Sequence, residues 1–289
     1  MAKFLIIGQG RIGKPLAQKI SQYGKVVAVA RRFRQYPAHL PIDFLQKDAA
    51  NLTLDDVAGS THIAVIITPT YQAYADKVAA YQASYLAVCQ QLANLAALAK
   101  TTPDGRAWLA GLSRIVFVSS TAVYGENGGE IITESTPAVP TAATAQVLLA
   151  AERALQAGFG DKAIIVRAGG IYHLGSTRLI EQAKAAHHAG VPLHHFTNRI
   201  MDSDLVNVLL NILILPTPKP MYLATDGVPV SSFLVLSFIA KTMHYLPPKV
   251  LDLPATGKQI CANIDGSWLQ FADYQAGYKA VMARLLSAS

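Results

Sequence analysis

Cysteine is scarce in this chain, and so is charge. Only two cysteines occur among 289 residues, Cys89 and Cys261, and they form no Cys-x-x-Cys pair. This argues against a disulfide scaffold and a thiolate zinc site, and we expect a cytoplasmic protein. Charged residues make up 15% of the chain and hydrophobic residues 52%, a balance that predicts a sizeable buried core rather than disorder.

Long apolar runs, internal repeats and low-complexity tracts are also missing. The apolar stretches 205–215 and 233–240 fall short of the roughly 18–20 residues that span a bilayer, so we interpret them as buried helices and expect no membrane partner. The first residues lead directly into the apolar run 4–7 and show no secretory signal pattern. The formal net charge is +7, but the basic residues are scattered, which favours a small anionic ligand over a nucleic acid.

The first half of the chain alternates β-rich and helical segments. Strands are predicted at 4–7, 26–30, 62–68, 115–119 and 163–167, with a weaker one at 44–45, and helices at 14–23, 72–100 and 143–156. Uniformly apolar strands suit a parallel sheet that is buried on both faces. We therefore predict a doubly wound α/β Rossmann sheet in residues 1–170. Residues 171–289 are expected to form a smaller, mostly helical substrate lobe that is interleaved with this core.

A glycine-rich hexapeptide lies directly between the first predicted strand and the first predicted helix: Gly8-Gln9-Gly10-Arg11-Ile12-Gly13. Its first glycine permits a tight turn, the second admits a pyrophosphate close to the backbone, and the third allows the helix to pack on the strand. Free N–H groups at the helix start then meet the phosphates. The six residues predict a dinucleotide-binding loop.

The end of the second strand indicates which dinucleotide is bound. An NAD site usually carries an acidic residue there, which accepts from the ribose 2′-OH. Here Arg31 and Arg32 occupy that place, and guanidinium groups suit the 2′-phosphate of NADP. We therefore expect NADP(H), with NAD as the alternative. Asp48, after the third strand, either contacts the adenine or caps the next turn.

Further cofactor contacts are expected where later strands end. These residues are Thr68, Ser119, Gly170 and Tyr172.

Five segments in the right order resemble the NAD-dependent epimerase/dehydratase family, which comprises extended short-chain dehydrogenases. They are Val-Ser-Ser-x-x-Val-Tyr-Gly at 118–125, Tyr-x-x-Ser at 81–84, and the stretches 167–172, 198–204 and 222–227. The resemblance implies a Rossmann core, a smaller C-terminal lobe and a small polar or sugar-like substrate. Relatives pair through two long helices, so the segments 72–100 and 143–156 allow a homodimer.

The chain departs from this family at the proton-transfer pair. The family's Tyr-x-x-x-Lys precedes a glutamate by four residues, and alignment on Glu152 puts Thr144 at the Tyr position and Leu148 at the Lys position. An aliphatic hydroxyl is too weak an acid to replace the phenol near neutral pH. The sequence thus resembles the atypical branch of the superfamily, which lacks this pair.

Three hydroxyl side chains remain as candidate catalytic groups. Ser120 stands where the family keeps a catalytic Ser or Thr, Thr121 is its neighbour, and Tyr124 either reaches the substrate or packs in the core. Histidine pairs at 187–188 and 194–195 have no carboxylate or cysteine at ligand spacing, so no metal site is predicted.

Three functions remain open. The first is an NADP(H)-dependent oxidoreductase or epimerase acting on a small polar substrate. The second is a catalytically silent NADP(H)-binding sensor or regulator. The third is a 2-hydroxyacid dehydrogenase type, whose Gly-x-Gly-x-x-Gly-x-x-x-Ala spacing fits residues 8–17; the motif at 119–125 and the short C-terminal region argue against it.

Overall fold

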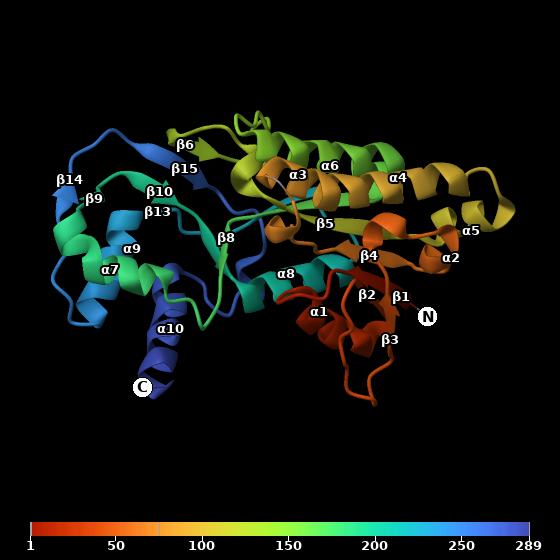
Figure 1. Ribbon diagram of the computed structural model, residues 1–289, viewed down its shortest axis with the longest axis horizontal. Coiled ribbons are helices and arrows are strands. Elements are labelled where there is room, and N and C mark those ends of the chain that lie inside the picture. The colour runs from red at the N-terminus through yellow and green to blue at the C-terminus, as the bar shows by residue number, and fades with distance from the viewer. Residues whose placement is uncertain (1, 75, 289) are drawn as a thin grey trace. The chain divides into compact units, whose positions relative to one another are not determined.

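The computed structural model describes residues 2–74 and 76–288 (Figure 1). The chain forms two compact units. The first contains the residues up to Gly125, Ala138–Arg167 and Leu209–Tyr222, and the second contains Glu126–Pro137, Ala168–Val208 and the residues from Leu223 onward. The chain therefore passes between the units repeatedly. From the sequence we expected a soft boundary after residue 170, with the second lobe interleaved with the first.

A seven-stranded sheet forms the centre of the first unit, in the order β12-β7-β5-β4-β1-β2-β3. Its strands are β1 Ala2–Ile7, β2 Gly24–Ala30, β3 Ile42–Gln46, β4 His62–Val65, β5 Arg114–Ser120, β7 Ala163–Ala168 and β12 Met221–Ala224. The five strands from β3 to β5 pair in parallel. Because the strand order reverses at β1, a ligand crevice is expected outside its carboxyl end. The sheet is the predicted Rossmann arrangement.

Helices cover both faces of this sheet. They are α1 Gly13–Ile20, α2 Leu54–Val57, α3 Lys77–Tyr81, α4 Ala87–Ala99, α5 Pro103–Gly111, α6 Ala143–Phe159 and α8 Asp202–Ile214, of which residues 209–214 belong to this unit. Figure 1 shows α4 and α6 on one side of the strands and α1 and α8 on the other. The apolar strand residues, such as Leu5, Ile6 and Ile63, are fully buried between the helical layers.

The long helix predicted at 72–100 is broken in the structure. A 3₁₀ turn occupies Tyr71–Ala73, α3 begins after Asp76, and a π-helical turn at Gln82–Leu86 leads into α4. The carboxylate of Asp76 accepts from the N–H of Ala79 at 2.8 Å and so starts a new helix. Within the π turn, the Ser84 hydroxyl donates to the carbonyl of Ala80 at 2.6 Å, a type of contact that bends helices. Ala75 lies outside the described residues.

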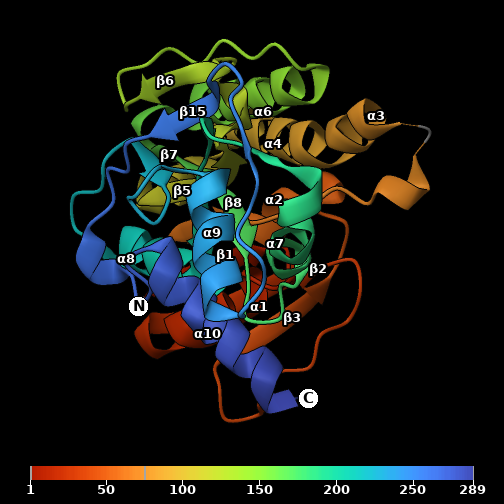
Figure 2. The same ribbon diagram turned by 90° about the vertical axis from the view of Figure 1, so that its left-hand side faces the viewer.

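The second unit contains more strands than the sequence analysis expected. Its strands are β6 Gly128–Ile132, β8 Gly170–Tyr172, β9 Val191–Pro192, β10 His195–Thr197, β11 Arg199–Met201, β13 Val230–Ser231, β14 Val250–Leu251 and β15 Thr256–Ile260. Four of them form the sheet β13-β10-β15-β6, and the others pair in twos; β6 and β15 lie side by side in Figure 2. Strands of two to five residues carry almost no periodicity, so a mostly helical lobe was predicted instead.

Three helices build the apolar core of the second unit: α7 Arg178–Ala189, α9 Ser232–Thr242 and α10 Tyr274–Ala288. Ile180 and Ala183 of α7 pack with Val235 and Ile239 of α9. None of the described helices combines the length and hydropathy that a bilayer-spanning helix needs.

Arg114 ties the start of β5 to the end of α8. Its buried guanidinium Nη1 donates to the carbonyl oxygens of Ile212 at 2.8 Å and Leu215 at 2.5 Å. These carbonyls belong to the last turn of the helix and the residue after it, where no further backbone donor follows.

We expect Arg114→Met to lower the free energy of unfolding by about 2 kcal/mol, because one buried and one half-buried carbonyl lose their donor. Urea denaturation followed by circular dichroism checks this. A loss below about 0.5 kcal/mol, the usual range for surface substitutions, would contradict the capping role.

Candidate functional site

The glycine-rich loop has the geometry that a bound pyrophosphate requires. Gly8 has a φ of +94°, and a Cβ there would collide with the carbonyl oxygen of Ile66. Gly13 is packed in the same way against the carbonyl of Gly8, whereas a Cβ at Gly10 would point into open space. A side chain would therefore clash at Gly8 and Gly13, whereas the space at Gly10 is free for a ligand to approach the backbone. This is what the roles assigned to the three glycines require.

At the start of α1, the N–H of Lys14 donates to the carbonyl of Gly10 at 3.2 Å and Pro15 has no N–H, so these two residues offer no free donor to an anion. The residue before the helix is Ile12, whose aliphatic side chain provides no acceptor for the first-turn donors. Ile12 itself is buried, and Arg11 is exposed. The positive end of the helix dipole still favours an anion here.

A cavity of about 700 Å³ lies in front of the glycine loop. It is enclosed by residues that follow the carboxyl ends of β1, β2, β3 and β4. Among the predicted cofactor residues, its lining includes Gly8, Gln9, Gly10, Arg31, Arg32, Asp48 and Thr68. The structure therefore brings together seven predicted residues from four separate segments.

The lining residues that were not predicted as site residues include Arg34, Lys47 and Thr70. Arg31 Nη2 donates to Thr70 Oγ1 at 2.7 Å, and Lys47 forms an ion pair with Asp56 at 2.6 Å. Arg34 stands two residues after Arg32, so its membership of the same basic cluster could have pointed to it. The cavity wall thus carries four cationic side chains, one of them already paired.

Asp48 caps the short helical turn after β3. Its carboxylate accepts from the N–H of Ala50 at 3.0 Å, which is the capping alternative of the two considered from sequence. It also lines the cavity, so the cap and a contact with a ligand are compatible.

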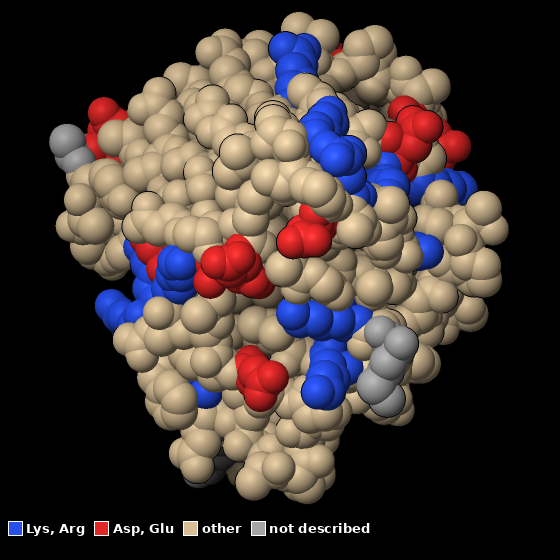
Figure 3. All heavy atoms as spheres, turned by 90° about the vertical axis from the view of Figure 1, so that its right-hand side faces the viewer, with Lys and Arg blue, Asp and Glu red and all other residues tan. Residues whose placement is uncertain are grey.

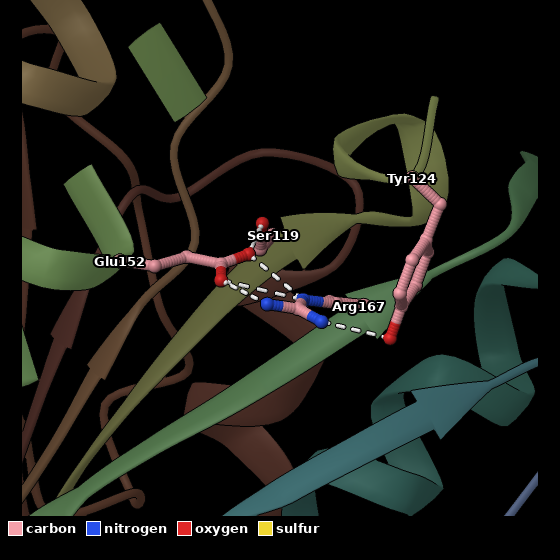
Figure 4. Close-up of polar contacts among 4 residues, drawn as sticks. All are labelled: Ser119, Tyr124, Glu152 and Arg167. Atoms are coloured by element: carbon pink, nitrogen blue, oxygen red, sulfur yellow. Dashed lines mark hydrogen bonds and ion pairs between the residues drawn. The ribbon is translucent and has the colours of Figure 1, made fainter. Parts of the chain in front are cut away.

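Four buried polar side chains form a hydrogen-bonded network near the carboxyl ends of β5 and β7 (Figure 4). Glu152 of α6, 1% exposed, accepts from the Ser119 hydroxyl at 2.5 Å and forms an ion pair with Arg167 Nη2 at 2.7 Å. Arg167 Nη1 also donates to the phenol oxygen of Tyr124 at 2.7 Å. Burial lowers the pKa of the Arg167 guanidinium, but its contacts with Glu152 and Tyr124 outweigh this and raise it.

The predicted catalytic hydroxyls lie in different environments in and around this network. Tyr124 is packed in the core with its phenol oxygen against Arg167. The Ser119 hydroxyl is engaged by Glu152. The Ser120 hydroxyl accepts from the N–H of Ala122 at 3.1 Å and caps the following turn, and both Ser120 and Thr121 are half-buried.

At the positions of the family's proton-transfer pair, the structure offers no ionisable side chain. Leu148 is buried, and Thr144 is half-buried in the first turn of α6. Glu152 lies four residues after Leu148 on the same helix and is held by Arg167 rather than directed to solvent.

The second unit contains a cavity of its own, with a volume of about 630 Å³. Its lining includes two further predicted cofactor residues, Gly170 and Tyr172, together with Arg178, Asn198 and Arg199. Arg199 is 5% exposed, and its Nη2 donates to the backbone oxygen and the hydroxyl of Thr197. Its Nη1 has no hydrogen-bond partner among the described residues.

Two other groups near Arg199 lack a partner within the described part of the chain: the Tyr172 hydroxyl and Asp226 Oδ2. Burial raises the pKa of Asp226 to about 7, although the charge of Arg199 lowers it. Asp204 is the third residue of α8, and its carboxylate accepts from the N–H groups of Gln270 at 2.8 Å and Phe271 at 3.1 Å.

The histidine pairs show no metal-binding geometry in the described residues, where no group of three metal-ligating side chains converges. His187 Nδ1 hydrogen-bonds with the carbonyl of Pro247 at 2.9 Å, and His195 Nδ1 with Thr256 Oγ1 at 2.8 Å.

On the face in Figure 3, lysine and arginine side chains stand in small groups with aspartate and glutamate among them.

The sequence profile of the NAD-dependent epimerase/dehydratase family matches residues 4–206. The chain belongs to this family. No curated protein matched the sequence. Among solved structures, a protein from Methylobacillus flagellatus described as an NAD-dependent epimerase/dehydratase is 25% identical, with a TM-score of 0.73 and 99% of each chain covered.

Two further neighbours of this family member were solved with NAD. UDP-glucuronic acid 4-epimerase from Bacillus cereus is 17% identical, with a TM-score of 0.69 and coverage of 98% of this chain and 99% of that one. The enzyme WbmG from Bordetella bronchiseptica is 16% identical, with a TM-score of 0.69 and coverage of 98% and 94%. At these identities the likeness shows a common fold alone.

Proposed function

We propose that this family member binds NADP(H) in the cavity of its first unit and acts as an oxidoreductase or epimerase on a small, polar, anionic or sugar-like substrate. The observation that carries the proposal is the cavity lining, where an open glycine loop faces Arg31, Arg32 and Arg34. The loop and the start of α1 would hold the pyrophosphate. The bound nicotinamide would supply hydride transfer.

The three guanidinium groups support NADP(H) over NAD(H). The wall after β2 holds no carboxylate to accept from a ribose 2′-OH; its residues 30–34 are Ala-Arg-Arg-Phe-Arg. A phosphate at the 2′ position would instead receive charge-assisted hydrogen bonds from Arg31 and Arg32. The two solved neighbours carry NAD, so the proposed preference for NADP(H) rests on the arginines of the present chain alone.

The cavity of the second unit supports a substrate with an acidic group. Arg199 is buried, lines the cavity and keeps one guanidinium nitrogen without a partner. Asp226 lies close enough for the charge of Arg199 to lower its pKa, and a phosphate or carboxylate of the substrate would add a second anionic partner for the guanidinium. UDP-glucuronic acid, which names the substrate of the neighbour from Bacillus cereus, contains both phosphate groups and a carboxylate.

Titration of the purified protein with NADPH and NADH, followed by nicotinamide fluorescence, tests the cofactor proposal. We expect at least a tenfold preference for NADPH. In the double variant Arg31→Ala, Arg32→Ala, the Kd for NADPH should rise roughly 10–100-fold, on the scale of one or two charge-assisted hydrogen bonds, while the Kd for NADH changes less than about twofold. Arg106→Ala, on an exposed helix of the same unit, serves as the matched control. Equal affinity of the unaltered protein for both dinucleotides would refute the NADP(H) assignment.

A catalytically silent NADP(H)-binding regulator is the second candidate. The observation that favours it is the replacement of the proton-transfer pair by Thr144 and the buried Leu148. Turnover of sugar nucleotides or ketones, measured by nicotinamide absorbance, separates the two functions. If turnover occurs and persists in Ser120→Ala, Ser120 is not the residue that orients the substrate.

A further inference from the structure

The arginines of the cofactor cavity stand on a connection that has no regular structure of its own. Segment 31–41 joins β2 to the parallel strand β3, and all of it is described, without helix or strand (Figure 1). A crossover between parallel strands usually contains a helix, which packs on the sheet and fixes the connection. Here other contacts must hold the guanidinium groups in place.

Tyr36 supplies such a contact, to the glycine loop. Its phenol donates to Gln9 Oε1 at 2.5 Å. The same side-chain amide uses Nε2 to donate to the carbonyl of Ile6 at 2.5 Å, so Gln9 is anchored to β1. Gln9 is only 4% exposed, and its side chain is therefore directed into the protein although it occupies the variable position of Gly-x-Gly.

Three further interactions reinforce this link between the segment and the glycine loop. Arg34 Nε donates to the backbone oxygen of Gln9 at 3.3 Å. The Tyr36 ring lies 5.8 Å from Lys14 Nζ of α1 and 6.5 Å from the ring of Phe44 of β3. Tyr36 thus contacts the glycine loop, the first helix and the third strand at once.

The phenol keeps its proton across the physiological range. Burial raises the pKa of Tyr36 to about 12, although Arg34 lowers it. Deprotonation of the phenol therefore does not break the hydrogen bond to Gln9 between pH 5 and 9.

We propose that Tyr36 is a positioning residue for selectivity towards the 2′-phosphate: through Gln9 it holds the arginine-bearing segment 31–41 against the glycine loop. The inference rests on the proposed NADP(H) function and deepens it. Tyr36 would not touch the phosphate. It would lower the conformational entropy that Arg31, Arg32 and Arg34 lose when they close on it.

Tyr36→Phe tests this inference, with adenosine 2′,5′-bisphosphate and 5′-AMP as probes in calorimetric titrations. The two probes differ in the 2′-phosphate, so the ratio of their Kd values reports on its recognition. We expect the Kd of the bisphosphate to rise about tenfold and that of 5′-AMP to change less than twofold. Tyr23→Phe, at an exposed tyrosine of the same unit, should leave both values unchanged.

The same substitution in the Arg31→Ala, Arg32→Ala background completes a double-mutant cycle. There Tyr36→Phe should have a much smaller further effect on the bisphosphate, because two of the three guanidinium groups that it positions are gone. Gln9→Met, which removes the acceptor instead of the donor, should also raise the Kd of the bisphosphate relative to that of 5′-AMP, and it provides a second reading if the first variant folds poorly.

The outcomes separate the inference from the function beneath it. If the unaltered protein shows no preference for the bisphosphate, the NADP(H) proposal and this inference both fail. If the preference exists but Tyr36→Phe weakens both probes equally, or neither, only the role of Tyr36 is overturned.

Discussion

Replacing Arg167 by methionine should lower the free energy of unfolding by about 3–5 kcal/mol, the range for breaking one side of a buried ion pair. Glu152 would remain in the core, at 1% exposure, without its guanidinium partner. Tyr124 would also lose the donor to its phenol oxygen. The carboxylate and the phenol would then be left with fewer polar partners in a medium that solvates them poorly.

Urea denaturation at pH 7 measures this loss, and two further variants identify its cause. Arg153→Met changes the exposed arginine next to Glu152 on the same helix and should cost less than about 0.5 kcal/mol. Adding Glu152→Gln to Arg167→Met removes the unpaired charge and should restore part of the stability. If the double variant is less stable than Arg167→Met, the unpaired carboxylate of Glu152 is not the cause of the lost stability.

The central sheet and the cofactor loop could be read from the sequence because their determinants are local. Runs such as Phe4–Ile7 are apolar throughout, and the glycines directly follow one of them. A buried parallel strand requires the first feature, and a turn with a positive φ at Gly8 requires the second. Neither depends on knowing what lies across the fold.

The remaining parts of the site depend on contacts between distant segments. The Tyr36 hydrogen bond joins residues on two separate loops, and nothing in the neighbourhood of Tyr36 distinguishes it from another surface tyrosine. The partner of Ser119 is 33 positions away on α6. An expectation based on the strand end assigned Ser119 to the cofactor, whereas the structure shows its hydroxyl bonded to Glu152.

The helix break before α4 could not be predicted from the sequence for a third reason. Apolar spacing continues from 77 to 99, so periodicity alone predicts one helix. The interruption arises from single hydrogen bonds made by Asp76 and Ser84 to nearby backbone groups. Short polar side chains often compete with the helix in this way, but sequence does not reveal which of them will succeed.

Asp226 should make the second unit less stable as the pH rises. The carboxyl is 3% exposed, and burial raises its pKa to about 7, with Arg199 acting in the opposite direction. In the unfolded chain an aspartate has a pKa of about 3.9, so between pH 4 and 7 the folded state binds the proton more tightly. Stability contributed by the protonated form is complete below about pH 4 and is lost as the pH rises through 7. The difference of about three units between the pKa values of the folded and unfolded states corresponds to about 4 kcal/mol of folding stability.

Asp226→Asn removes this titration while keeping the size and polarity of the side chain. The variant should be about as stable as the unaltered protein at pH 4 and more stable by about 2–4 kcal/mol at pH 8–9, because it never acquires the buried charge. Thermal unfolding followed by circular dichroism from pH 4 to 9 measures the difference between the two proteins, which cancels the titration of all other groups. Asp252→Asn, on an exposed side chain of the same unit, is the matched control. A constant difference across the whole range would mean that Asp226 is already ionised at pH 4, and that Arg199 outweighs burial.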